Sequence, residues 1–144
     1  GIMAITYTNV IYDNVIDALN TLISDEVSVH VRYDEHTGNQ SFLITPASDS
    51  LIDHTTVTQV REYSLEIAYQ LKSGGRYTRN NLKRVSEVSE RLKRLVHNNT
   101  VNGSGATYKW QDGNVSGVEY ARDEDDPSVL GSLTTFNCVV QESY

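Results

Sequence analysis

The feature that most constrains the fold is a twelve-residue stretch, Val60 to Leu71, in which apolar and polar side chains alternate. Tyr63, Leu65 and Ile67 fall on one side of this stretch, and the residues between them are polar or small. Such a period of two predicts a β-strand with one buried face. Twelve residues at about 3.3 Å each span roughly 40 Å. We therefore expect this strand to bend, or to project beyond its sheet as one arm of a hairpin.

A helix is predicted after the strand, beyond a break at Gly74-Gly75 that permits almost any backbone turn. From Asn80 to Val96 apolar residues recur at helical spacing, and most of the remaining positions are charged or polar. Glu87 with Arg91, and Glu90 with Arg94, are predicted to form ion pairs between residues four apart. This segment is thus expected to be a basic amphipathic helix.

The remaining pattern predicts an α+β fold in one domain that spans residues 1–144, with the element order α-β-β-β-α-β-β-β. The sheet is expected to be mostly antiparallel or mixed, and to pack against two helices. Residues 47–56 are polar and predict a loop or a hairpin tip, anchored by Leu51 and Ile52. The other predicted elements are a helix over 10–24 capped by Thr8 or Asn9, strands at 27–32 and 41–45, a hairpin over 108–120 that turns at Asp112-Gly113-Asn114, and a last strand over 132–142.

Charge is unevenly distributed along the chain, which has a formal net charge of −7. Residues 79–97 hold six basic and two acidic side chains, for a net +4, so the remainder carries −11. The densest acidic segment runs from Asp123 to Asp126. A basic helix face and an acidic loop are complementary surfaces that can meet between two copies of the chain. The predicted interface residues are Lys83, Arg84, Arg91, Arg94, Asp123, Glu124, Asp125 and Asp126.

Each of these two charged clusters has alternative interpretations. The basic cluster can be a solvated helix face, a subunit interface or a contact with nucleic acid. The acidic segment can be a solvated loop or a docking surface for a basic partner, and it lacks the glycine and distal glutamate of a calcium loop.

We find no sequence pattern that indicates catalysis, a metal site or a cofactor. The four histidines have no metal-ligand spacing, and no serine lies in a nucleophile elbow. Cys138 has apolar neighbours in its predicted strand, which favours a packed thiol over a nucleophile. One cysteine excludes an internal disulfide and is typical of a reducing compartment. Neither a signal peptide nor a membrane span is expected. We therefore expect a protein that is not an enzyme.

Five segments together resemble one known family of proteins. They are the helix end Asp-Ala-Leu-Asn-Thr-Leu-Ile (17–23), the strand Arg-Glu-Tyr-Ser-Leu-Glu-Ile-Ala-Tyr (61–69), the helix Val-Ser-Glu-Arg-Leu-Lys-Arg-Leu-Val (88–96), and Tyr-Lys-Trp-Gln-Asp-Gly-Asn-Val (108–115) ahead of a closing Phe-Asn-Cys-Val-Val-Gln-Glu (136–142). In this element order the chain resembles the tail terminator, or tail completion, proteins of tailed bacteriophages, and more loosely their neck proteins.

The resemblance implies a homo-oligomer, a hexameric ring that caps the tail tube, ends its polymerisation and joins it to the head-side connector. Its partners would be the tail tube protein and the connector or neck proteins, and genomic DNA would pass through the lumen without specific binding. Such a protein is assembled in the host cytoplasm and resides in the tail or neck of the virion. The nine tyrosines against two phenylalanines fit a surface that contacts other proteins.

Three alternatives remain open. One is another head–tail neck or connector protein. A second is a cytoplasmic small-molecule-binding α+β domain, which would need a closed pocket with convergent polar groups. The third is a nucleic-acid binder that uses the cations between Arg79 and Arg94.

Overall fold

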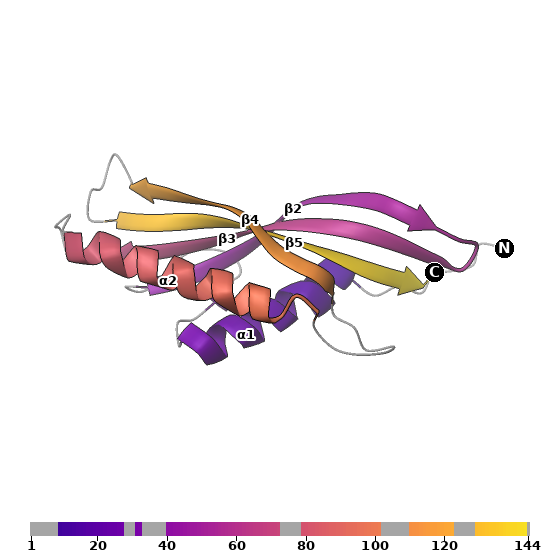
Figure 1. The fold of residues 1–144 in the computed structure, drawn as a ribbon, viewed down its shortest axis with the longest axis horizontal. Coiled ribbons are helices and arrows are strands. Elements are labelled where there is room, and N and C mark those ends of the chain that lie inside the picture. The colour runs from indigo at the N-terminus through magenta and orange to yellow at the C-terminus, as the bar shows by residue number, and fades with distance from the viewer. Residues whose placement is uncertain are drawn as a thin grey trace.

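A four-stranded antiparallel sheet and two helical segments form an α+β fold in the computed structural model (Figure 1). The structure describes residues 9–27, 31–32, 40–72, 79–101, 110–122 and 129–143. The four strands are β2 (Gln40–His54), β3 (Thr58–Lys72), β4 (Gln111–Arg122) and β5 (Val129–Ser143). They lie in the spatial order β2-β3-β5-β4, and each is antiparallel to its neighbours. A two-residue strand, β1 (Val31–Arg32), adds a short parallel pairing to β2.

The first helical segment begins as a π-helix, η1 (Val10–Ile16), and continues as α1 (Asp17–Val27). The side-chain oxygen of Asn9 accepts a hydrogen bond from the backbone N–H of Tyr12 at 3.3 Å. Asn9, one of the two candidates from the sequence, is therefore the cap. The helix continues three residues beyond the predicted end at residue 24.

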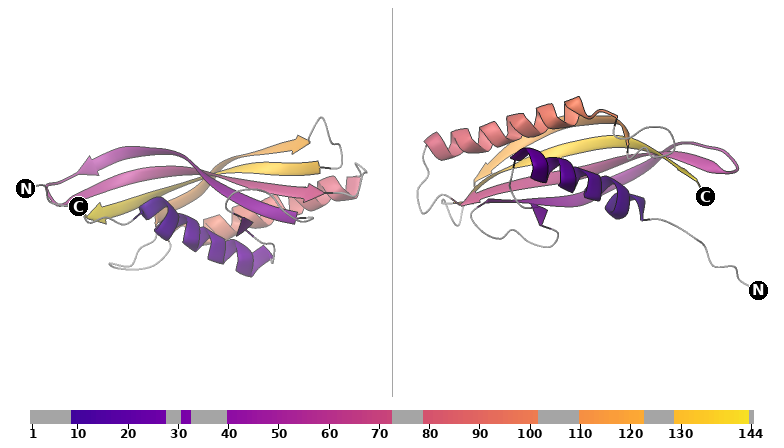
Figure 2. Two further views of the ribbon diagram at one scale, coloured as in Figure 1. Left: turned by 180° about the vertical axis from the view of Figure 1, so that it is seen from behind. Right: turned by 90° about the horizontal axis from the view of Figure 1, so that it is seen from below.

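The second helix, α2 (Arg79–Asn98), matches the predicted basic amphipathic helix. Both helices lie on the same face of the sheet (Figure 2). This face carries the alternate residues of β3 predicted to be buried, and they share one core with both helices. The largest fully buried side chains are Trp110, Phe42, Phe136, Ile16, Leu19, Ile23, Leu65, Ile67, Leu92 and Leu130. Burying a side chain of this size is worth roughly 1.5–3 kcal/mol, so this shared core holds the helices to the sheet.

The sheet extends well beyond the helices at one end (Figures 1 and 2). There β2 and β3 form a projecting arm, residues 46–63, and the end of β5 runs beside it. Thr55 closes the hairpin, since its Oγ1 accepts the backbone N–H of Thr58 at 3.0 Å and that of Val57 at 3.2 Å. The prediction that the long strand projects as one side of a hairpin is thus confirmed.

The predicted order with six strands is wrong. Within the predicted strand 27–32, Val27 ends α1, and the other two described residues, Val31 and Arg32, pair with β2. Of the two alternatives predicted for residues 47–56, the hairpin tip is the correct one: residues 47–54 form strand rather than irregular loop, and 55–57 make the turn. Leu51 and Ile52 are not buried anchors, because they are 49% and 54% exposed.

The predicted hairpin turn at Asp112-Gly113-Asn114 is instead an irregularity inside β4. The register against β5 shifts between Gln111 and Asn114, and Asp112 takes a positive φ of 50°. The physical reason is Trp110, which is fully buried and stacks edge-on against Phe136 with ring centroids 5.3 Å apart. The chain bends here to deliver the indole to the core, and it does not turn back on itself.

Candidate subunit interface

The basic residues of α2 occupy the helix surface that remains when its apolar stripe packs on the sheet. Val85, Val88, Leu92 and Val96 are buried at spacings of three and four residues. The predicted interface cations lie off this stripe and differ in their surroundings. Lys83, Arg91 and Arg94 are exposed, whereas Arg84 is half-buried.

Arg91 ties the two helices together. Its Nη2 donates to the backbone carbonyl of Glu26 at 2.6 Å, and lies 3.3 Å from the Glu26 carboxylate. The predicted pair of Arg91 with Glu87 is therefore replaced by a contact with α1. The last turn of a helix presents unsatisfied carbonyl groups and negative dipole charge, and both attract a guanidinium. Arg91 thus has a structural role within one chain.

Arg94 forms the predicted pair with Glu90, at 2.7 Å between Nη1 and Oε2. Lys93 adds a second cation to the same carboxylate, at 2.5 Å between Nζ and Oε1. Hydrogen bonds from Lys93 and Arg94 hold the pKa of Glu90 below its ordinary value. Exposed pairs of this kind stabilise a helix only weakly, because water screens both charges. Arg94 is thus engaged, although weakly, by a carboxylate of its own helix.

Arg84 lies near the hydroxyl of Tyr69, on the sheet side of α2. Tyr69 donates to Oε1 of Gln40 at 2.5 Å, and its ring packs 5.1 Å from that of Phe42. Burial raises the pKa of Tyr69 above its ordinary value, and the guanidinium of Arg84 partly opposes the shift. Arg84 thus interacts with a buried phenol of its own chain.

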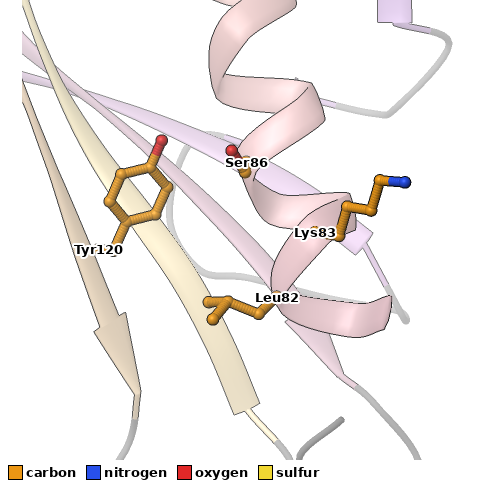
Figure 3. A pocket seen from close by; sticks show the side chains of 4 residues that line it. All are labelled: Leu82, Lys83, Ser86 and Tyr120. Atoms are coloured by element: carbon orange, nitrogen blue, oxygen red, sulfur yellow. The ribbon is translucent and has the colours of Figure 1, made fainter. Parts of the chain in front are cut away.

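Lys83 borders an open groove between α2 and β4, together with Leu82, Ser86 and Tyr120. Leu82 and Ser86 come from the helix and Tyr120 from the strand opposite, and the Lys83 ammonium points away from the tyrosine (Figure 3). Leu82 is 37% and Tyr120 49% exposed. Lys83 makes no ion pair with another described residue. Of the predicted cations, it is thus the one left to face a partner.

The acidic half of the predicted interface, Asp123, Glu124, Asp125 and Asp126, lies outside the described residues. Its pairing with the basic helix face therefore stays a prediction.

A polar network on the arm was not foreseen from the sequence. Arg61 bonds to Asp49 at 2.5 Å and to Gln59 at 2.7 Å, and Gln59 donates to Glu142 at 2.9 Å. Tyr63 donates its hydroxyl to the same glutamate. These residues come from β2, β3 and β5, so only the strand register brings them together. No local sequence pattern could have revealed the network.

The thiol of Cys138 is buried in the core, as predicted for a packed cysteine. Burial, with a smaller contribution from the charge of Glu62, raises its pKa to about 12. Within the described ranges, no group of three or more histidine, cysteine, aspartate or glutamate side chains is arranged to hold a metal ion. Neither described helix has the length and apolar character required to cross a membrane.

Comparison of the chain with protein-family models and with curated proteins found no match.

Proposed function

We propose that this chain is a structural subunit of a tailed-bacteriophage tail or neck ring, of the tail terminator type. It caps the tail tube, ends its polymerisation and joins it to the head-side connector. The proposal rests on the sequence resemblance, and the fold supports it through the surfaces that it leaves open. The chain acts by assembly and not by catalysis.

The observation that carries the proposal is the sheet face opposite the helices. No described element covers this face (Figures 1 and 2). It nevertheless presents the apolar side chains of Leu43, Ala68, Leu133 and Val139, each half-buried among polar neighbours. The strand register places Leu43, Ala68 and Leu133 side by side across three strands, and clustered apolar side chains on an uncovered face mark a site of contact with other proteins. A subunit of a larger assembly accounts for such a face better than an isolated domain does.

The charge balance fits the same function. A ring that surrounds DNA in transit must not bind it tightly, and binding to phosphates requires clustered, available cations. The net charge of −7 opposes such binding. Arg91 and Arg94 are already engaged by carboxylates of their own chain, which weakens the case for a nucleic-acid contact.

Two measurements test the proposal. Light scattering should give the purified protein a mass of several subunits, six if the resemblance holds in full. The protein should also bind the ends of tail tubes and arrest their growth, as seen by electron microscopy. A strict monomer that leaves tube length unchanged would rule the proposal out. A ring that binds only the head-side connector would favour the alternative, a neck protein.

A further inference from the structure

Three large apolar side chains are exposed at the tip of the arm. Leu51 is 49%, Ile52 54% and Val57 66% exposed. They lie within seven residues of one another, at the end of the molecule farthest from the start of α2 (Figure 1). Single exposed apolar residues are normal on a protein surface, but a cluster at the end of a projection marks a contact site.

The apolar groove between α2 and β4 lies at the opposite end of the sheet. Tyr120, in the groove, is level with Tyr69 of β3, because both pair with Ser132 of β5. Tyr69 is eleven residues along β3 from Thr58, which lies at the arm tip. Eleven residues of strand correspond to roughly 36 Å. The tip therefore cannot reach the groove of its own chain.

We propose that the arm tip of one copy docks into the α2–β4 groove of the next copy. Leu51 and Ile52 of the tip contact Leu82 and the ring of Tyr120. The inference rests on the proposed ring function and identifies the surfaces through which its subunits meet.

Charge complementarity favours a second copy as the occupant of the groove. The arm segment 46–57 contains Asp49 and Asp53 and has no lysine or arginine. Asp49 is engaged by Arg61, whereas the Asp53 carboxylate bonds only to the backbone N–H of His54 among the described residues. The groove is bordered by Lys83, and the first turn of α2 has no acidic residue. Asp53 of one copy is thus matched by Lys83 of its neighbour.

This contact joins two different surfaces at opposite ends of the molecule. Head-to-tail contacts of that kind close into rings when the rotation between copies permits, and otherwise form open filaments. Each copy has one tip and one groove. The same contact can therefore join every pair of neighbours in an assembly, and no second type of interface is needed.

The test uses two variants that each remove one side of the contact. Leu51→Ser with Ile52→Ser removes the tip, and Leu82→Ser with Tyr120→Ser removes the groove. Val101→Ser, which alters a residue that is 52% exposed but belongs to neither surface, is the matched control. Circular dichroism melts check that every variant is folded, and light scattering gives the mass in solution.

We expect the wild type and the control to be oligomeric, and each double variant to be monomeric at the same concentration. A mixture of the two double variants keeps one intact tip and one intact groove, so it should form a dimer and stop there. Exchange of the charges gives a second test that does not depend on apolar packing. Asp53→Lys and Lys83→Asp should each weaken assembly at least tenfold, and the two changes together should restore it.

Two results would overturn the inference in distinguishable ways. Oligomers that persist in both double variants, with no effect of the charge changes, would overturn the tip-to-groove contact and leave the ring function standing. A wild type that is monomeric at every concentration would overturn this contact, and one that also leaves the length of tail tubes unchanged would overturn the ring function with it.

Discussion

Thr134 places a hydroxyl in the core of the sheet, fully buried beneath the helices. Its Oγ1 has no hydrogen-bond partner among the described residues. A buried hydroxyl without a partner costs about 1–3 kcal/mol, and valine has nearly the same shape without the polar atom. Thr134→Val should therefore raise the free energy of unfolding by about 1 kcal/mol, measured by urea denaturation.

Thr135→Val is the control for this change, because it alters the next residue, which is half-buried on the uncovered face. Its effect should stay within about 0.5 kcal/mol. A loss of stability in Thr134→Val would show that the hydroxyl has a partner in the folded protein.

Cys138 should be unreactive in the folded protein. The thiolate is the reactive species, and burial raises the pKa of this thiol to about 12. At pH 8 an aromatic disulfide reagent should therefore label the native chain far more slowly than the chain in denaturant. Fast labelling under native conditions would mean that β5 opens readily at this position.

At the scale of the elements, the arm depends on polar contacts because no helix covers it. Tyr63 sits where the inner sheet face changes from apolar to polar, and its hydroxyl donates to Glu142. Tyr63→Phe removes that donor from a carboxylate, which should cost about 1–2 kcal/mol because the acceptor, Glu142, is only half-buried. Chemical denaturation at neutral pH measures the loss.

The same residue should make stability depend on alkaline pH. Burial is the largest cause that raises the pKa of Tyr63 well above its ordinary value, and the bond to Glu142 adds to it. The folded phenol keeps its proton after the unfolded one has lost it, so this contribution is complete below the unfolded pKa of about 10 and declines as pH rises further. The decline above pH 10 should be less steep in Tyr63→Phe, by up to about 1.4 kcal/mol per pH unit. Parallel curves for wild type and variant above that pH would contradict this assignment.

How far the elements could be predicted depended on how much of each one is buried. Apolar residues alternate with polar ones in β3 from Tyr63 to Leu71, and they recur at helical spacing in α2. Both patterns arise because the core requires apolar side chains at the buried positions. Residues 47–54 of β2 lie beyond the helices, where no core imposes a pattern, so the sequence could not distinguish a loop from a hairpin. The arm network escaped prediction because cross-strand register, and not sequence spacing, brings Asp49 to Arg61 and Gln59 to Glu142.

The candidate interface was predictable only in part, for a related reason. The cations of α2 are evident in the sequence, but their partners in α1 depend on how the helices pack. Arg91 therefore contacts Glu26 of α1, whereas Lys83 forms no ion pair with a described residue. The groove could not be predicted because one of its sides is Tyr120 of β4. The sequence had suggested a hairpin where β4 continues as a single strand.

At the scale of the whole molecule, the uncovered sheet face, the apolar arm tip and the apolar groove are all surfaces that a neighbour would cover. If copies associate through them, association stabilises the folded chain, because only the folded chain presents these surfaces. The melting temperature should then rise with protein concentration. Scanning calorimetry or circular dichroism over about a hundredfold range of concentration measures this shift. The variant Leu51→Ser with Ile52→Ser should melt at one temperature throughout that range, since it loses association while its buried core is unchanged. A melting temperature of the wild type that does not change with concentration would be inconsistent with reversible self-association, and the three surfaces would then belong to contacts with other proteins.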